Sequence, residues 1–121
     1  MEIVNYGFGH VTIDGKDYDK DLVIRSDGSV VRRKKKLSRG GAGHTPLSNR
    51  EMKEYLGGEA PSKFIVGTGK YGALPVKDGV RRITEKRGIE LICEKTEMAI
   101  DTYLDLLSRG ERVAALFHLT C

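Results

Sequence analysis

The sequence predicts an α/β domain in which helices pack on a sheet whose neighbouring strands are parallel. From residue 62 onward, short apolar runs alternate with amphipathic stretches in the order β-α-β-α-β, and this alternation is typical of a sheet with helical crossovers. The first third of the chain instead has strand-like runs separated by Asp-Gly turn signals. The length of 121 residues suits one domain. With no linker or internal repeat, we predict a single domain over residues 1–121.

Residues 1–36 are predicted to form β-hairpins. Asp14-Gly15 and Asp27-Gly28 each stand between two runs of strand-forming residues, and an Asp-Gly pair favours the turn that matches the twist of a hairpin. The four runs are 11–13, 16–18, 22–25 and 29–31. Two such turns so close together predict an antiparallel meander.

A first helix is predicted to begin at Ser48. Ser48 and Glu51 have the spacing of a capping box, in which each side chain accepts from the other's backbone N–H, and Leu47 can pack on Met52 one turn later. Gly57-Gly58 is expected to end the helix. The preceding residues 37–46 are predicted to be a loop, because Pro46 and three glycines oppose regular structure.

The remaining elements follow from apolar spacing and from glycines at their ends. Ala99, Ile100 and Tyr103 recur at helical spacing on one face of the longest segment. The short run before Gly67 is apolar throughout, which suits a buried strand. We predict strands at 63–66, 89–93 and 112–117 and helices at 78–87 and 96–108.

The positive charge of the chain is concentrated in one segment. The net charge is +4, and it becomes −1 without the five consecutive cations of 32–36. The candidate contact surface comprises Arg32, Arg33, Lys34, Lys35, Lys36 and Arg39. It could attract phosphates or an acidic protein, or its lysines could protect an exposed edge strand from pairing with another chain. No aromatic residue lies between Val30 and Arg39 to stack on bases, which counts against recognition of single-stranded nucleic acid.

A second candidate is the glycine loop, residues 67–72. Its sequence matches G-x-G-x-x-G after a predicted strand. A dinucleotide site needs a helix that opens directly at the glycines, whereas Pro75 delays the next helix. Lys70 is followed by Tyr71 instead of Ser or Thr, which excludes a Walker A loop. The backbone amides of Gly67, Thr68, Gly69 and Lys70 could still hold a small anion or a partner's carboxylate. Alternatively, the glycines only permit a tight turn.

Catalytic and metal-binding signals are absent from the sequence. His10, His44 and His118 are scattered, and no nucleophile or metal-ligand signature accompanies them. Cys93 and Cys121 form no CxxC pair. We predict no catalytic residue, no metal and no cofactor, and an enzyme is not favoured. Residues 1–5 lack the basic and apolar regions of a secretory signal, and the apolar runs are too short to span a membrane. We therefore expect a cytoplasmic protein.

Several short motifs, in order, resemble a known family. They are Asp27-Gly28-Ser29, His44-Thr45-Pro46, the run Phe64-Ile65-Val66-Gly67-Thr68-Gly69, Gly88-Ile89-Glu90, Thr96-Glu97, Ala99, Tyr103, Arg109-Gly110-Glu111-Arg112-Val113 and Phe117-His118-Leu119-Thr120-Cys121. Together they are similar to the small domain shared by the adipogenesis-associated domain-containing protein, the mitochondrial complex I assembly factor and prokaryotic relatives. The resemblance implies a three-layer α/β fold, with a mixed central β-sheet flanked by helices and an additional N-terminal β-hairpin layer. It implies no established catalytic residue and no cofactor.

These observations together predict a non-enzymatic cytoplasmic binding or assembly-factor-like module with a protein partner. Two alternatives stay open. One is nucleic-acid binding through the basic segment 32–39. The other is binding of a small anion or phosphate ligand, with or without catalysis, at the glycine loop 67–72.

Overall fold

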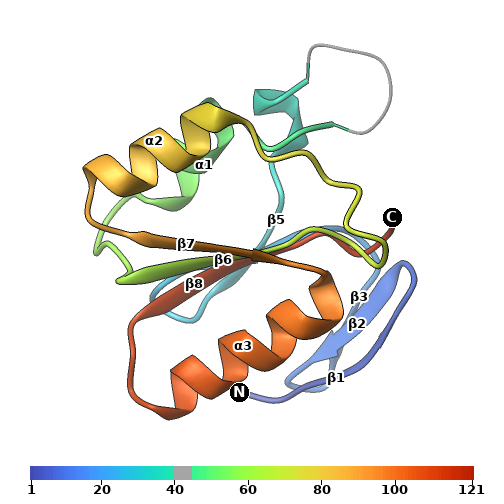
Figure 1. Ribbon diagram of the computed structural model, residues 1–121. Coiled ribbons are helices and arrows are strands. Elements are labelled where there is room, and N and C mark those ends of the chain that lie inside the picture. Colours follow the sequence, from blue (N-terminus) through green and yellow to red (C-terminus); the bar gives the residue numbers. More distant parts are fainter. Residues whose placement is uncertain (40–44) are drawn as a thin grey trace.

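The computed structural model describes residues 1–39 and 45–121, so the predicted loop around His44 lies in part outside the described residues. The strands are β1 (Ile3–Gly7), β2 (His10–Ile13), β3 (Lys16–Tyr18), β4 (Leu22–Ile24), β5 (Val30–Arg32), β6 (Lys63–Gly67), β7 (Glu90–Glu94) and β8 (Val113–Phe117). The helices are η1 (Lys35–Leu37, a 3₁₀ turn), α1 (Asn49–Tyr55), α2 (Asp78–Lys86) and α3 (Thr96–Ser108). The order β-α-β-α-β from β6 onward confirms the predicted organisation (Figure 1).

The described strands form two sheets. The central sheet has the order β5-β4-β8-β6-β7, and the smaller sheet has the order β1-β2-β3. β6 pairs in parallel with both β7 and β8, whereas β4 pairs antiparallel with β8 and β5. The central sheet is therefore mixed, as predicted.

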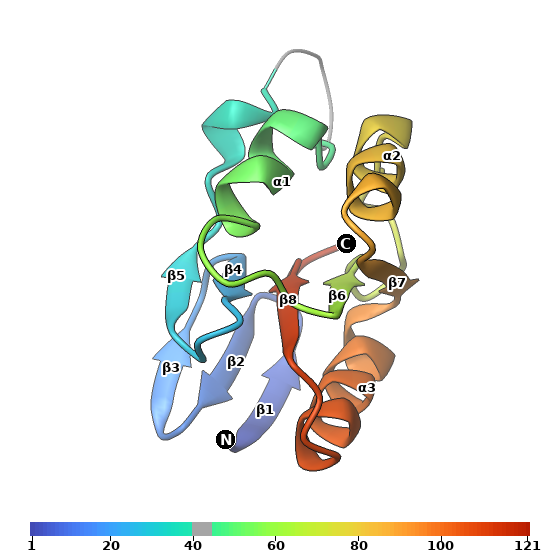
Figure 2. The same cartoon turned by 90° about the vertical axis from the view of Figure 1, so that its left-hand side faces the viewer.

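Each face of the central sheet carries its own layer. Helices α1 and α2 cover one face, and α3 together with the three-stranded sheet covers the other (Figures 1 and 2). Successive residues of β6 point to opposite faces: Phe64 and Val66 belong to the core beneath α1 and α2, and Ile65 belongs to the core beneath α3. The predicted three-layer fold with an N-terminal β layer is confirmed.

The two predicted hairpins form, but the predicted meander is wrong. Asp14 and Gly15 both have positive φ, +49° and +80°, as the expected hairpin turn requires. However, β3 and β4 belong to different sheets. All three residues of β4 are buried, and a strand with both faces buried belongs inside a covered sheet. β4 therefore lies between β5 and β8 instead of continuing the first hairpin.

The start of α1 confirms half of the predicted capping box. Ser48 Oγ accepts from the backbone N–H of Glu51 at 3.3 Å, and Leu47 and Met52 are both buried. The reciprocal bond does not form, because the Ser48 N–H donates to Ser38 Oγ at 3.1 Å. The Glu51 carboxylate is thereby available for other partners.

Candidate functional site

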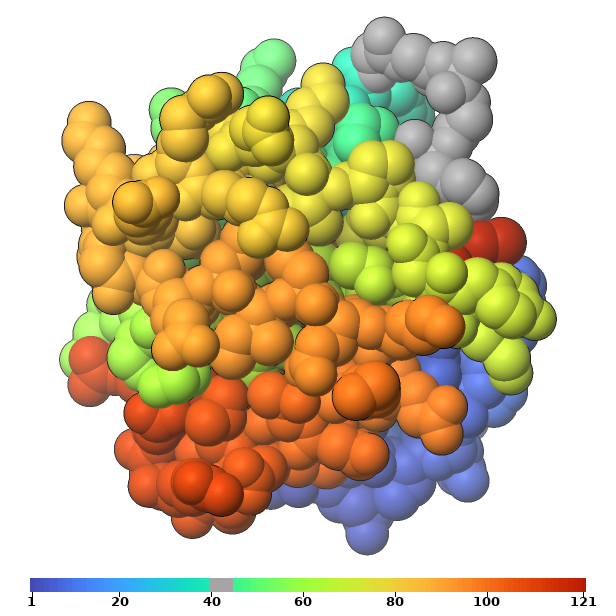
Figure 3. All heavy atoms as spheres, in the orientation of Figure 1, coloured from blue at the N-terminus to red at the C-terminus, as the bar shows by residue number. Residues whose placement is uncertain are grey.

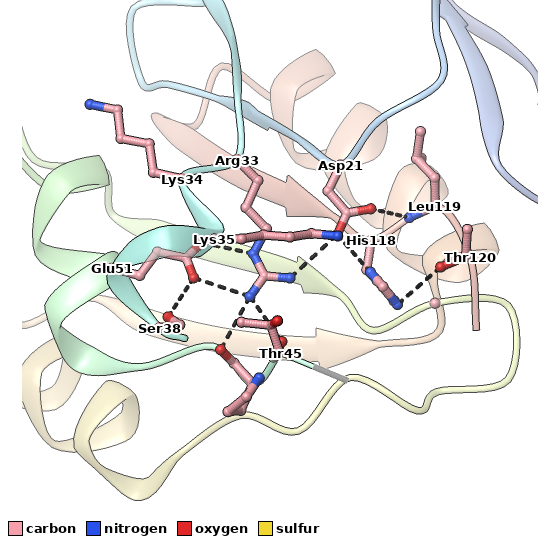
Figure 4. A network of polar contacts seen from close by, with 12 residues as sticks. Asp21, Arg33, Lys34, Lys35, Ser38, Thr45, Glu51, His118, Leu119 and Thr120 are labelled. Atoms are coloured by element: carbon pink, nitrogen blue, oxygen red, sulfur yellow. Dashed lines mark hydrogen bonds and ion pairs between the residues drawn. The ribbon is translucent and has the colours of Figure 1, made fainter. Parts of the chain in front are cut away.

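The basic segment is not a continuous strand, and one of its arginines is buried. β5 ends at Arg32, and the chain then turns into η1. Arg33 is only 7% exposed, so its predicted place on the contact surface is wrong. Its Nε donates to Glu51 Oε2 at 2.8 Å and its Nη2 to Glu51 Oε1 at 3.0 Å, while Nη1 donates to Asp21 Oδ2 at 3.3 Å. Nη2 also donates to the carbonyl oxygens of Thr45 and Pro46 at 3.1 and 3.2 Å (Figure 4). Two carboxylates and two carbonyls therefore hold the guanidinium in place.

Glu51 is the centre of this buried network. Its side chain is 0% exposed, and besides Arg33 it accepts from Ser38 Oγ and, at 2.6 Å, from the Tyr55 hydroxyl. Burial and the neighbouring Glu51 raise the pKa of Tyr55 far above its usual range, so the phenol stays protonated and donates. The same hydroxyl accepts from the Lys34 backbone N–H at 2.8 Å. These bonds attach α1 to the segment that follows β5.

Asp21 extends the network to the C-terminal end of β8. Its carboxylate accepts from His118 Nδ1 at 2.6 Å and from the Leu119 backbone N–H at 2.9 Å, and Lys35 Nζ lies 3.7 Å away. Burial alone would raise the pKa of Asp21, but the hydrogen bond from His118, the Leu119 amide and the charges of His118 and Lys35 lower it to about 2. His118 is only 4% exposed. The Asp21–His118 pair therefore connects β4 to β8 internally instead of presenting a base at the surface.

A basic hollow lies directly above this network. Its volume is about 670 Å³. The cationic side chains that line it, apart from the buried Arg33, are Lys20, Arg32, Lys34, Lys35, Lys36 and Arg39, and the acidic ones are Asp21 and Glu54. Lys34 Nζ lies 3.4 Å from Glu54 Oε2 in an exposed pair. The structure thus gathers the predicted basic residues, Arg33 excepted, around one concave surface above the buried ionic network.

A second basic hollow, of about 750 Å³, lies between α1 and α2. Its lining includes Lys53 from α1 and, from α2 and its N-cap, Lys77, Arg82 and Lys86, with Asp78 as its acidic residue. Glu54, the next residue after Lys53, lines the first hollow, so α1 separates the two. Sequence reasoning missed this site because its cations are spread over two mixed-charge helices and form no run.

The glycine loop is occupied by other parts of the chain. The N–H groups of Thr68, Lys70 and Tyr71 donate to the backbone oxygens of Glu94, Thr120 and Cys121 at 2.8, 2.8 and 3.1 Å. The Gly69 N–H donates to Thr96 Oγ1 at 2.8 Å.

Gly69 itself shows why the loop needs glycine. It has φ +105°, and a Cβ at this position would lie 2.2 Å from the carbonyl carbon of Cys121. These observations favour the interpretation in which glycine permits a close approach of chain segments, since the amides of 68–71 already have acceptors.

The other sequence candidates are not brought together. His10 is exposed on β2, and Cys93 is half-buried on β7. Burial raises the pKa of the Cys93 thiol, which opposes thiolate formation. Over residues 1–39 and 45–121, no group of three or more His, Cys, Asp or Glu side chains could hold a metal ion. None of the helices in the same ranges is long and apolar enough to cross a membrane.

Comparison with known proteins identifies the family. Residues 3–118 match the family described as protein of unknown function (DUF498/DUF598). The chain belongs to this family. Among solved structures, this DUF498 protein is similar to the conserved hypothetical protein PH1505 from Pyrococcus horikoshii OT3, with 34% identity, a TM-score of 0.90 and full coverage of both chains. It is also 34% identical to a protein called MT938, with a TM-score of 0.83 over 98% of this chain and 97% of that one. A Bordetella parapertussis protein, 19% identical with a TM-score of 0.77 over 97% and 93% of the two chains, shares the fold.

Proposed function

We propose that this DUF498 protein is a non-enzymatic binding module whose contact surface is the basic hollow above the Asp21–Arg33–Glu51 network. The observation that carries the proposal is the lining of that hollow, where six cations other than Arg33 face two carboxylates. The partner is a macromolecule that presents carboxylates or phosphates at its surface.

The arrangement of the hollow favours an anionic partner. Lys34, Lys35 and Lys36 all line one hollow, so their positive charges repel each other in the free protein and an anion brought between them relieves that repulsion. The buried ion pairs beneath hold the backbone of this segment, so little order has to be gained on binding. A preformed surface loses less conformational entropy when a partner binds.

The family resemblance supports binding over catalysis. The order of its motifs resembles that of the small domain shared by the adipogenesis-associated domain-containing protein and the mitochondrial complex I assembly factor, and this resemblance supports an assembly-factor-like module. The cytoplasm is its proposed compartment. In such a module, the conserved fold serves to present a surface, and the partner is determined by the side chains on that surface.

Titration with two labelled polyanions, poly-L-glutamate and a DNA duplex of mixed sequence, tests the proposal. At about 50 mM salt we expect saturable binding of at least one of them, and a variant with Lys34, Lys35 and Lys36 replaced by Gln should bind about tenfold or more weakly. The matched control replaces Lys16, Lys70 and Lys95, which are exposed elsewhere, by Gln. If neither polyanion binds, or if the control variant loses as much affinity as the variant at Lys34, Lys35 and Lys36, the basic hollow is not a contact surface.

A further inference from the structure

We propose that the basic hollow is one part of a larger basic face, and that this face binds the phosphate backbone of double-stranded DNA without preference for base sequence. The basic face is defined by residues 32–39, 49–55 and 77–87, and it includes the hollows on both sides of α1. The inference rests on the proposed function and specifies its partner.

The charge of the basic face is far larger than the net charge of the chain. Its three segments contain thirteen Lys and Arg residues against four Asp and Glu, whereas the rest of the chain contains eight against thirteen. Figure 2 shows the three segments together at one end of the molecule, with α1 between η1 and α2. Arg33 and Glu51 neutralise each other inside, so most of the remaining excess is carried by exposed side chains. Such a concentration of cations on one face is the electrostatic footprint of a nucleic-acid-binding protein.

The basic face lacks the apolar anchors that a protein interface needs. Stable protein interfaces are centred on buried aromatic or aliphatic side chains. The large apolar side chains that are exposed in the described residues are Met1, Val4, Phe8, Tyr71 and Met98, and all five lie outside the three segments. Phosphate groups, in contrast, need only cations, and the face supplies them.

The same surface favours a duplex over single strands. The one aromatic residue in the three segments, Tyr55, is buried, so no ring is exposed there to stack on unpaired bases. Asn49 is the single neutral hydrogen-bonding side chain exposed on the face in the described residues, so the face is suited mainly to charge contacts with phosphates, which position a duplex without reading its sequence. A duplex presents two phosphate strands, and α1 divides the face into two basic hollows that could receive one strand each.

The salt dependence of binding to a labelled DNA duplex of about 16 base pairs tests the inference, because each phosphate contact contributes about 0.9 to the slope of log K against log salt. Two triple variants carry the test, one with Lys34, Lys35 and Lys36 and the other with Lys77, Arg82 and Lys86 replaced by Gln. We expect both to bind more weakly and to flatten the slope by up to about three. The control variant at Lys16, Lys70 and Lys95 should keep the wild-type slope.

Three outcomes would overturn the inference in different ways. Binding of poly-L-glutamate without binding of DNA would leave the proposed function standing and show that the partner is an acidic protein. An unchanged slope in the variant at Lys77, Arg82 and Lys86 would show that the second hollow takes no part. A single strand, or an RNA duplex of the same sequence, that binds about tenfold more tightly than the DNA duplex would exclude duplex DNA as the preferred partner.

Discussion

Helices α1 and α3 are attached to opposite faces of the same sheet by different chemistry. α3 has thirteen residues and buries Ala99, Ile100 and Tyr103, so its attachment is the apolar stripe that helical spacing predicts. α1 has seven residues, and the first residue that it buries is the carboxylate Glu51, bound to Arg33. A short helix gains little from its own hydrogen bonds, and α1 is held by a buried ionic network in addition to the apolar contacts of Met52 and Tyr55.

The surfaces of the two layers differ in the same way. Residues 1–18 and 96–108, which form the layer with α3, contain one Lys and six Asp or Glu residues, whereas the basic face has a large excess of Lys and Arg. Figure 3 shows α2 and α3 as separate surfaces on either side of β7. The Asp21 carboxylate lies beneath the cations of the first hollow, 3.7 Å from Lys35 Nζ, where it offsets part of their mutual repulsion. The ionic network that helps to hold α1 therefore lies directly beneath the cations of the first hollow.

Removal of the central carboxylate should have the largest effect on stability. Glu51→Gln leaves the Arg33 guanidinium buried without its bidentate partner, and breaking a buried ion pair from one side costs about 3–5 kcal/mol of unfolding free energy. Urea denaturation at neutral pH measures this cost. Glu97→Gln, an exposed carboxylate in the first turn of α3, is the matched control and should cost less than about 1 kcal/mol.

An equal and small cost for Glu51→Gln and Glu97→Gln would contradict the claim that the two layers are attached differently. A variant in which Arg33→Met and Glu51→Leu are combined should recover only part of the lost stability. The double replacement removes the unpaired buried charge, but it leaves the Ser38 and Tyr55 hydroxyls without their acceptor.

The network should also make stability depend on acid pH through Asp21. The folded pKa of about 2 lies below the usual value of 3.8, so the carboxylate stabilises the fold above about pH 5, and this contribution is lost as the pH falls through the folded value. The difference corresponds to about 2 kcal/mol. Denaturation of the wild type and of Asp21→Asn across this pH range should show the loss in the wild type only. Asp101→Asn, at an exposed position in α3, should leave the dependence of unfolding free energy on pH as it is in the wild type. If Asp21→Asn also left this dependence unchanged, Asp21 would not be its source.

The smallest expected effect is a difference in unfolding free energy between two tyrosine-to-phenylalanine variants, one in α1 and one in α3. Tyr55→Phe removes a hydroxyl that donates to Glu51 and accepts from the Lys34 N–H, so it should cost about 1–2 kcal/mol through unsatisfied partners. Tyr103→Phe keeps the edge-to-face ring contact with Phe117, whose centroid is 6.0 Å away, and should cost less. Thermal unfolding of the two variants measures this difference. A larger drop in unfolding temperature for Tyr103→Phe than for Tyr55→Phe would contradict the role given to the Tyr55 hydroxyl.

The sequence predicted most of the fold because the signals are local. The Asp14-Gly15 turn needs two positive φ angles at adjacent residues, and the start of α1 needs an oxygen at Ser48; both can be recognised from a few neighbouring letters. The separation of β3 from β4 could not be predicted in this way, since it depends on which strands bury both faces. The second hydrogen bond of the capping box, from the Ser48 N–H to Glu51, could not be excluded in this way either. The Glu51 carboxylate binds Arg33 instead, and Arg33 lies outside the local pattern.

The candidate site was predicted only in part. The positive charge of the run 32–36 can be recognised from the sequence, but nothing in the run distinguishes the buried Arg33 from the exposed Lys34. Asp21 and His118 are 97 residues apart, and no spacing rule joins them. The cations of α2 were missed because their neighbours include acids, and only the packing of α2 beside α1 places them next to the first hollow.

Residue-by-residue mapping of amide chemical shifts during titration with a DNA duplex of about 16 base pairs tests whether the basic face is the contact surface. It locates the contact surface without any substitution. We expect the shifts that saturate at low salt to cluster in residues 32–39, 49–55 and 77–87 and to disappear as salt is raised. Shifts confined to the glycine loop 67–72 and to residues 119–121, or spread over α3 and the three-stranded sheet, would contradict this expectation.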